Sequence, residues 1–183
     1  MGLLKDEDCD VRLTAAYTLG AQSQLPQNAI TTVVELLENE DSNVRSKAAG
    51  ILKGQSQLPQ EAATALVTLL KDKDGDVRST TADTLKGQSQ LPQEAVTALV
   101  ELLENEDSNV RSKAAYILGA QSRLPQKTVT ALVTLLKDKD GDVRSTTADT
   151  LKGQSQLPQE AVTALVELLE NEDSNVRSKA AVT

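Results

Sequence analysis

The stretch LLKDKDGDVRSTTADTLKGQSQLPQEAVTALVE, residues 69–101, decides the fold, because its pattern returns every 33 residues along the chain. A fixed period of this length is typical of repeat proteins, in which each copy is one supersecondary unit that buries its apolar face against its neighbours. We therefore expect residues 1–183 to form a single repeat array. The copies, of which the last is partial, are 3–35, 36–68, 69–101, 102–134, 135–167 and 168–183.

Each copy contains a first helix, here called helix A. In the quoted copy Asp74 is suited to cap its N-terminus, and Val77 and Leu85 fall on one apolar face. The pair Lys86-Gly87 follows that face. Because glycine tolerates the left-handed conformation that often ends a helix, we expect helix A to close there with Gly87 in that conformation.

A second helix, here called helix B, follows a short polar connector. Pro92 fits the first turn of a helix, where its missing N–H is not needed, and we expect helix B to run from about Pro92 to about Leu103. Its apolar residues cover a wide arc of the helix surface, which indicates burial against both helix A and a neighbouring copy. Two helices and two short loops use the whole repeat, so the pattern predicts an all-α stack of antiparallel helix pairs.

Composition narrows the class of partner. The formal net charge is −8, and only the copy 102–134 is positive on its own. This balance argues against nucleic acid, whose affinity comes largely from Lys and Arg, and favours a protein with a basic surface. No apolar run approaches membrane-spanning length and no signal-peptide pattern is present, so we expect no membrane partner and a cytoplasmic protein.

Catalysis has few candidate residues. The chain has no His and a single Cys, Cys9, which excludes Ser-His and Cys-His nucleophile pairs, histidine metal sites, thiol metal clusters and an internal disulfide. The glycines are isolated, so there is no phosphate-binding loop. We expect no enzyme activity, no cofactor and no bound metal.

One motif resembles the opening of a calcium loop. It is Asp72-Lys73-Asp74-Gly75-Asp76, and it recurs at residues 138–142. An EF-hand loop needs Gly at its sixth position, where this chain has Val77 and Val143. Helix capping by these aspartates is therefore the preferred interpretation.

The helix A pattern carries a family resemblance. Asp8-Cys9-Asp10-Val11-Arg12, followed by Ala15, Ala16, Leu19 and Gly20, resembles the D-x-x-VR-x-x-AA-x-x-LG helix of the short, phycobilisome-lyase-like HEAT repeat. The resemblance covers essentially the whole chain, although the Gln-Ser-Gln-Leu-Pro connector is longer than that family's usual linker. It implies a right-handed α-solenoid that binds proteins, with its B helices on the concave side.

The resemblance also implies that the arginine of each Val-Arg pair joins a ladder with aspartates. The arginines are Arg45, Arg78, Arg111 and Arg144, and the implied partners are Asp41, Asp74, Asp107 and Asp140 or their equivalents in the adjacent copy. The alternative is a simple surface pair within one helix, four residues apart, which would contribute only about 0.3–0.5 kcal/mol.

Two exposed stripes are candidates for protein binding. The first, on the A helices, is the most varied exposed position among the copies and holds both aromatic residues, which are favoured as binding anchors. The second, on the B helices, is more uniform, with a threonine three residues after each member. The helix A stripe is Tyr17, Gly50, Asp83, Tyr116, Asp149 and Val182; the helix B stripe is Asn28, Glu61, Glu94, Lys127 and Glu160.

The sequence therefore predicts a non-catalytic scaffold that presents an extended surface to a protein. Neither end of the chain resembles a polar cap: Leu3-Leu4 has the pattern of the end of a helix B, and the chain stops within a helix A. This leaves open a piece of a longer array, or apolar ends covered by another chain through end-to-end self-association. Residues 64–115 and 130–181 are identical, so an engineered scaffold without a native ligand also remains open.

Overall fold

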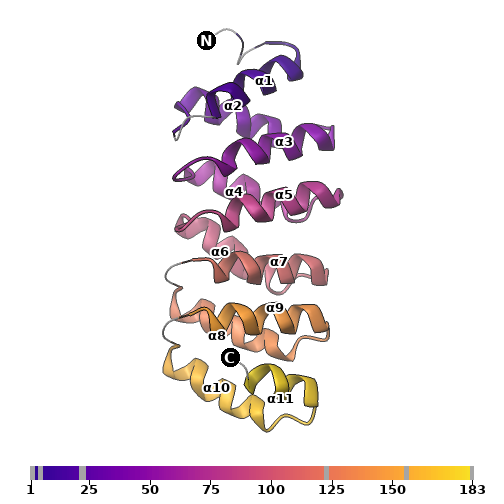
Figure 1. The fold of residues 1–183 in the computed structure, drawn as a ribbon, viewed down its shortest axis with the longest axis vertical. Coiled ribbons are helices and arrows are strands. Elements are labelled where there is room, and N and C mark those ends of the chain that lie inside the picture. Colours follow the sequence, from indigo (N-terminus) through magenta and orange to yellow (C-terminus); the bar gives the residue numbers. More distant parts are fainter. Residues whose placement is uncertain (1–2, 4–5, 21–23, 122–123, 155–156, 182–183) are drawn as a thin grey trace. The chain divides into compact units, whose positions relative to one another are not determined.

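The computed structural model describes residues 3, 6–20, 24–121, 124–154 and 157–181, and all its regular elements in these ranges are helices (Figure 1). They divide into two compact units, Met1–Val96 and Thr97–Thr183, with the boundary inside α6. The A helices are α1 (Cys9–Gly20), α3 (Ser42–Lys53), α5 (Gly75–Lys86), α7 (Ser108–Gly119), α9 (Gly141–Lys152) and α11 (Ser174–Ala181). The B helices are α2 (Gln27–Leu37), α4 (Gln60–Leu69), α6 (Gln93–Leu102), α8 (Gln126–Thr134) with the 3-10 turn η2 (Leu135–Lys137), and α10 (Gln159–Leu169).

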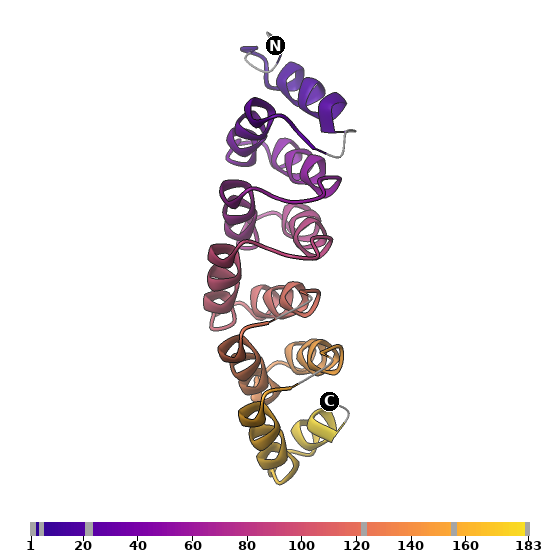
Figure 2. The same cartoon turned by 90° about the vertical axis from the view of Figure 1, so that its left-hand side faces the viewer.

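In the first unit the helices form two layers. Helices α1, α3 and α5 pack side by side in one layer, and α2 and α4 pack in the other (Figure 2). Each B helix also packs on the A helix that follows it, as α2 does on α3 and α4 on α5. The packing hairpin is thus a B helix followed by an A helix, which leaves α1 as an A helix without a preceding partner among the described residues.

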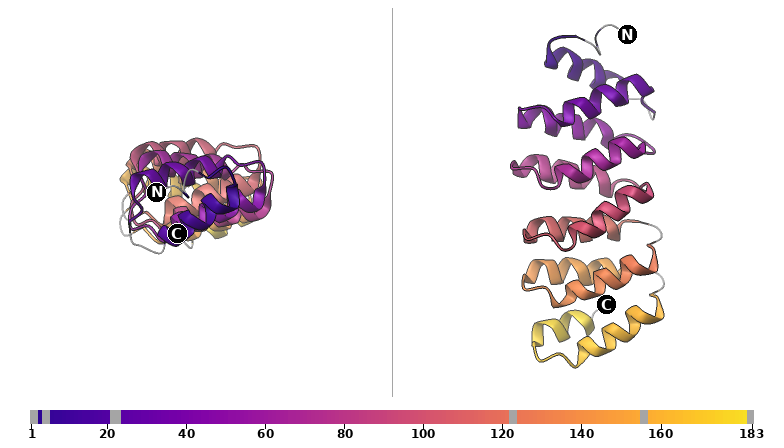
Figure 3. Two further views of the ribbon diagram at one scale, coloured as in Figure 1. Left: turned by 90° about the horizontal axis from the view of Figure 1, so that it is seen from above. Right: turned by 180° about the vertical axis from the view of Figure 1, so that it is seen from behind.

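The second unit repeats this arrangement. Helices α7, α9 and α11 form one layer and α8 and α10 the other, visible from behind in the right-hand view of Figure 3. Helix α10 packs on α11, and α8 with η2 packs on α9. Each unit is therefore a segment of an α-solenoid, as the 33-residue period predicts. That the copies form one array across both units stays a prediction.

In each unit the core is an aliphatic seam between its two layers. Leu52 and Leu85 in the first unit, and Leu118 in the second, sit at the same position of their A helices and have no exposed surface. Truncating such a leucine to alanine typically costs about 2–5 kcal/mol, so these positions hold the two layers of their own unit together.

The helix starts follow the predicted capping. The Asp74 carboxylate accepts hydrogen bonds from the backbone N–H groups of Asp76, at 2.9 Å, and Val77, at 3.3 Å. Asp41 accepts one from Asn43 at 2.8 Å. Val77 and Val143 are fully buried, so the Asp-Lys-Asp-Gly-Asp motif starts a helix, and the capping interpretation is confirmed.

Two details of the predicted helix ends are wrong. Gly87 follows α5 with φ of −64°, a right-handed conformation, and the described glycines include none with positive φ. The prolines before α2, α4, α8 and α10 are N-cap residues with extended backbone and not members of the first turn. A proline at the cap still accepts the first helical hydrogen bonds through its carbonyl, as Pro59 does from Ala63 at 3.0 Å.

Buried glutamines connect successive repeats, which the sequence did not suggest. Gln55 accepts a hydrogen bond from the Leu25 backbone N–H at 2.7 Å, and Gln88 donates to the Gln55 carbonyl at 3.1 Å. Both residues are at most 6% exposed. The short polar connector therefore buries its first glutamine as a link between repeats.

Candidate binding surfaces

The arginine of each Val-Arg pair positions the loop before its helix. Arg45 donates from one guanidinium nitrogen to the carbonyls of Asn39, at 2.7 Å, and Glu40, at 2.9 Å. Arg78, Arg111 and Arg144 make the same two bonds to their own loops. These bonds within one copy fix the acidic loop between a B helix and the next A helix.

Two of these arginines also pair with an aspartate of the adjacent repeat. Arg45 binds both carboxylate oxygens of Asp72, at 2.7 and 2.9 Å, and Arg111 binds Asp138 in the same way at 2.7 Å. All four side chains are at most 8% exposed. The hydrogen bond from Arg45 is the main reason that the pKa of Asp72 lies below its ordinary value. At Asp138 burial alone would raise the pKa, but the hydrogen bonds from Arg111 and from the Asp140 backbone lower it overall.

The ladder therefore forms between adjacent copies, with partners other than those expected. The partner is the residue two positions before the capping aspartate of the next copy. Asp41, Asp74, Asp107 and Asp140, the expected partners, instead accept backbone N–H bonds at the helix starts. The carboxylate of a capping residue points into its own helix start, which leaves the preceding aspartate to meet the arginine.

The helix A stripe is exposed at every described position. Tyr17 is 73% and Tyr116 39% exposed, and Gly50, Asp83 and Asp149 are also exposed. A Cβ atom at Gly50 would meet only Thr80, at 3.9 Å, so this position leaves open space on the surface. Val182 lies outside the described residues. The structure places the stripe on neighbouring A helices within each unit.

The helix B stripe is exposed as well, and in the first unit it borders a groove. Asn28, Glu61, Glu94, Lys127 and Glu160 all face solvent. Between α2 and α4 an open groove of about 660 Å³ is lined by Val34, Glu38, Pro59, Gln60, Glu61, Thr64, Ala65 and Thr68. Glu38 and Glu61 therefore stand on the two sides of a shallow, mostly uncharged floor. Sequence comparison of the copies singled out Glu61 but missed Glu38, which follows the last residue of α2.

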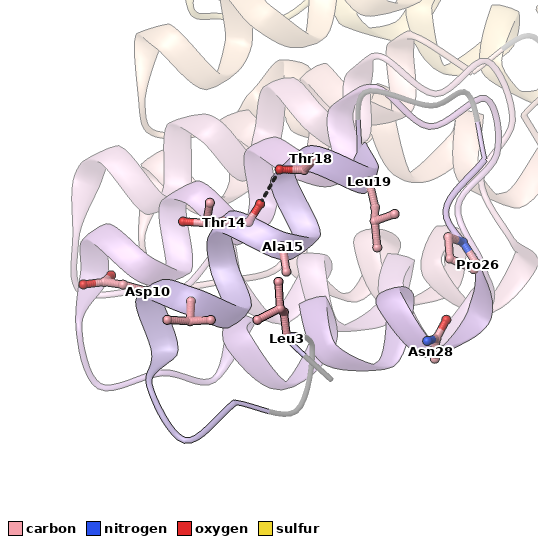
Figure 4. A pocket seen from close by; sticks show the side chains of 9 residues that line it. Leu3, Asp10, Thr14, Ala15, Thr18, Leu19, Pro26 and Asn28 are labelled. Atoms are coloured by element: carbon pink, nitrogen blue, oxygen red, sulfur yellow. Dashed lines mark hydrogen bonds between the residues drawn. The ribbon is translucent and has the colours of Figure 1, made fainter. Parts of the chain in front are cut away.

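A second hollow in the first unit lies on α1. It has a volume of about 660 Å³ and is lined mainly by apolar groups of Val11, Ala15 and Leu19, with the Leu3 side chain lying beside Ala15 and Pro26 on the side of Leu19 (Figure 4). Thr14 and Thr18 form part of its wall, and Thr18 donates a hydrogen bond to the Thr14 carbonyl at 2.8 Å. Leu3 is 62% exposed, and Leu4, expected with it to end a B helix, lies outside the described residues.

Chemistry other than binding has little support in either hollow. The groove between α2 and α4 offers carboxylate, amide and hydroxyl groups, and Asp10 is the one titratable side chain among the described residues that line the hollow on α1. Among the described residues, no group of three or more Cys, Asp or Glu side chains is placed to hold a metal ion. No helix in the described ranges is long and apolar enough to cross a bilayer.

Comparison with known proteins identifies the repeat type. The model for HEAT repeats matches residues 2–86, 63–152 and 129–183. No curated protein sequence matches the chain.

Several solved structures are similar in fold. Two engineered proteins from the Northeast Structural Genomics Consortium are 28% and 29% identical to it, with TM-scores of 0.57 and 0.56. Each match covers 99% of this chain, and they cover 92% and 55% of the engineered chains. A designed armadillo repeat protein in complex with the peptide (KR)4 has a TM-score of 0.56 at 16% identity, over 99% of this chain and 95% of that one, which is a likeness of fold alone.

Proposed function

Because the chain belongs to the HEAT repeat family, we propose that it is a non-catalytic binding module whose B helices hold an extended, basic segment of another protein. The observation that carries the proposal is the groove between α2 and α4, with Glu38 and Glu61 on its two sides. A repeat scaffold with a groove between the B helices of successive repeats fits a peptide that crosses from one repeat to the next.

Charge supports a basic ligand. Glu38 and Glu61 are exposed, and neither side chain forms a hydrogen bond or ion pair among the described residues. A lysine or arginine lying across the groove would meet a carboxylate on each side, while Thr64 and Ala65 form an uncharged floor. The net charge of −8 adds long-range attraction for a cationic segment, which raises the rate of encounter more than the final affinity.

The designed armadillo repeat protein supplies a precedent for the ligand. It has a similar fold and is in complex with (KR)4, a peptide of alternating lysine and arginine. The proposal for the present chain rests on its own carboxylates, and the precedent suggests a suitable probe. The absence of His from the sequence supports a binding role over a catalytic one.

The test uses labelled (KR)4 peptide and the full chain at low salt. We expect binding that weakens as NaCl is added, because exposed charge pairs are screened. Glu61→Lys and Glu38→Lys should each reduce affinity at least fivefold. Asp83→Lys is the matched control, since it makes the same charge change at an exposed position on the helix A stripe, and it should leave affinity within twofold of the parent.

The same experiment separates the two stripes. If Asp83→Lys, Tyr17→Ala or Tyr116→Ala weakens (KR)4 binding and Glu61→Lys does not, the ligand lies on the helix A stripe and the groove proposal fails. Equal loss in all variants would indicate attraction by net charge without a defined site.

End-to-end self-association is a second candidate function, favoured by apolar exposure on α10. Val162, Val166 and Leu169 are 38%, 55% and 45% exposed, whereas Val129 and Leu136, equivalent to the first and last of them, are at most 3% exposed. Sedimentation equilibrium of the parent and of Val166→Glu tests this: self-association predicts a mass that rises with concentration in the parent only. A scaffold engineered without a native ligand, consistent with the identical segments 64–115 and 130–181, predicts neither (KR)4 binding nor association.

A further inference from the structure

The exposed charges after α2 and after α4 have opposite signs. Glu38 and Glu40 follow α2. Lys71 and Lys73 stand at the equivalent positions after α4. All four side chains are exposed, and none forms a hydrogen bond or an ion pair among the described residues. A partner that passes from one helix end to the next therefore meets carboxylates first and ammonium groups second.

The aspartates beside the two lysines are already engaged. Asp72 is bound by Arg45 through two hydrogen bonds, at 2.7 and 2.9 Å. Asp74 accepts the backbone N–H groups of Asp76 and Val77 at the start of α5. Because these carboxylates face a guanidinium and a helix N-terminus, the lysines are the charges that the loop after α4 offers to a partner.

A hollow leads from the groove between α2 and α4 to this loop. It has a volume of about 730 Å³, and its lining includes Glu38 and Glu40 from the loop after α2 and Lys73 from the loop after α4. The buried pair of Arg45 with Asp72 also lines it. Glu38 lines the groove as well, so the two hollows are adjacent. A segment lying in the groove can therefore continue past Glu38 toward Lys73.

The spacing of the helices sets the spacing of charges on such a segment. Packed helices lie about 8–10 Å apart, and an extended chain advances about 3.3–3.6 Å per residue. One repeat step therefore takes about three residues of an extended ligand. Lys71 lies on the same path, because its backbone N–H bonds to the carbonyl of Thr68, which lines the groove, at 3.2 Å.

The second unit carries the same two signs in the opposite order. Lys137 and Lys139 are exposed at the end of η2 and in the loop after it. Glu170 and Glu172 are exposed after α10. A change of sign from one B helix end to the next is therefore a regular feature of each unit and not a single exception.

We propose that the ligand of the groove is an extended segment of mixed charge, with a pair of basic residues and, about three residues away, a pair of acidic ones. This inference rests on the proposed binding role of the groove and defines its ligand more closely. The basic pair meets Glu38 and Glu61, and the acidic pair meets Lys71 and Lys73. The two lysines repel a segment that stays basic through both places, so they act as specificity residues.

Two short peptides test the acidic half of the ligand. They are GKRGEEG and GKRGQQG with blocked ends, and they differ only in the replacement of two glutamates by neutral glutamines. With the full chain at low salt, GKRGEEG should bind at least about threefold more tightly, through its ion pairs with the lysines. The net charge of −8 acting alone would give the opposite order, because GKRGQQG is the more cationic peptide.

Variants locate the contact. Lys71→Glu/Lys73→Glu should reverse the preference, and it should fold, because the equivalent positions after α2 already hold glutamate. Lys47→Glu/Lys53→Glu is the matched control, since it makes the same charge change at exposed positions of α3 that line neither the groove nor the hollow between the loops, and it should keep the preference. Glu38→Lys should weaken both peptides at least about threefold, because both use the basic contact.

Some outcomes would overturn this inference. They are equal binding of the two peptides, tighter binding of GKRGQQG by the parent, and a preference for GKRGEEG that survives in Lys71→Glu/Lys73→Glu or is lost in the control variant. The (KR)4 experiment separates this failure from that of the proposed function. If Glu38→Lys and Glu61→Lys weaken (KR)4 binding while the parent does not prefer GKRGEEG, the groove holds a basic segment and the acidic contact is wrong. If neither (KR)4 nor either short peptide binds, both proposals fail.

Discussion

Arg45 and Arg78 occupy equivalent positions in neighbouring repeats, yet their surroundings differ. Arg45 holds Asp72 through two hydrogen bonds, whereas the Nε atom of Arg78 is buried without a hydrogen-bond partner among the described residues. The residue 27 positions after Arg45 is Asp72, and the residue 27 positions after Arg78 is Asn105. The arginine that is paired is thus the one followed, 27 positions later in the sequence, by an aspartate.

The second unit shows the same alternation. Arg111 binds Asp138, while the Nε atom of Arg144 is buried and unpartnered in the described structure, and the residue 27 positions after Arg144 is Asn171. All of these arginines still hold their own loop carbonyls. The Val-Arg motif thus has a local role in every repeat, and a pairing role between repeats only where aspartate stands two positions before the cap.

The largest effect expected from this difference is on stability. Arg45→Met should lower the free energy of unfolding by about 2–3 kcal/mol, because it removes the loop bonds and leaves the Asp72 carboxylate buried without its cation. Arg78→Met should cost about 1 kcal/mol, since it removes loop bonds only. Chemical denaturation followed by circular dichroism measures both.

The control for this comparison is Arg45→Met combined with Asp72→Asn. If the buried carboxylate causes the extra loss, the double variant should recover part of it. Equal destabilisation by Arg45→Met and Arg78→Met would mean that the pair with Asp72 contributes nothing beyond the loop bonds.

Low pH should reduce the stability that the Arg45–Asp72 and Arg111–Asp138 pairs contribute. Hydrogen bonds from Arg45 hold the pKa of Asp72 below its ordinary value, and at Asp138 those from Arg111 and the backbone outweigh the opposing effect of burial. A lowered pKa in the folded state gives stability that is present above the unfolded value, about 3.9, and is lost as pH falls through the folded value. We expect the parent to be more stable than Asp72→Asn/Asp138→Asn at pH 6 and the difference to shrink below pH 4.

Urea denaturation of both proteins at pH 6, 4 and 3 measures this effect. The asparagine at each site keeps an acceptor for the following backbone N–H, as Asn39 does for Asp41 at 2.9 Å. A stability difference that stays constant with pH would show that the loss comes from something other than the ionised carboxylates.

Much of the fold follows from the sequence because every copy repeats the same pattern, which makes the assignment of its two helices unambiguous. The positions of helices A and B, the Asp74 cap and the buried Val77 depend on contacts within one copy or on a seam that every copy repeats. The ladder partners depend on how one loop meets the next copy, which residue spacing alone does not give. The buried glutamines were missed because a polar connector normally stays in solvent.

The candidate surfaces were only partly predictable. Exposure of Tyr17 and Glu61 follows from helical periodicity, and the structure places both on the surface. The groove beside Glu61 depends on the separation of α2 and α4, and the hollow on α1 depends on the absence of a described partner helix. The distance between two helices of different copies is not encoded in the pattern of a single copy.

The substitution with the smallest expected effect on stability is also the sharpest test of the ladder, because it adds an interaction instead of removing one. Asn171→Asp would place a carboxylate at the position that Asp72 and Asp138 occupy in the paired junctions, within reach of the unpartnered Nε atom of Arg144. The aspartate would keep the bond that Asn171 accepts from the Asp173 N–H at 2.9 Å. We expect a gain of about 1 kcal/mol, since α11 is the last helix of its unit and the new pair is less enclosed than Arg45 with Asp72. The gain should disappear in an Arg144→Met background, and a gain that persists there would come from the added charge near the start of α11 instead of from a completed ladder.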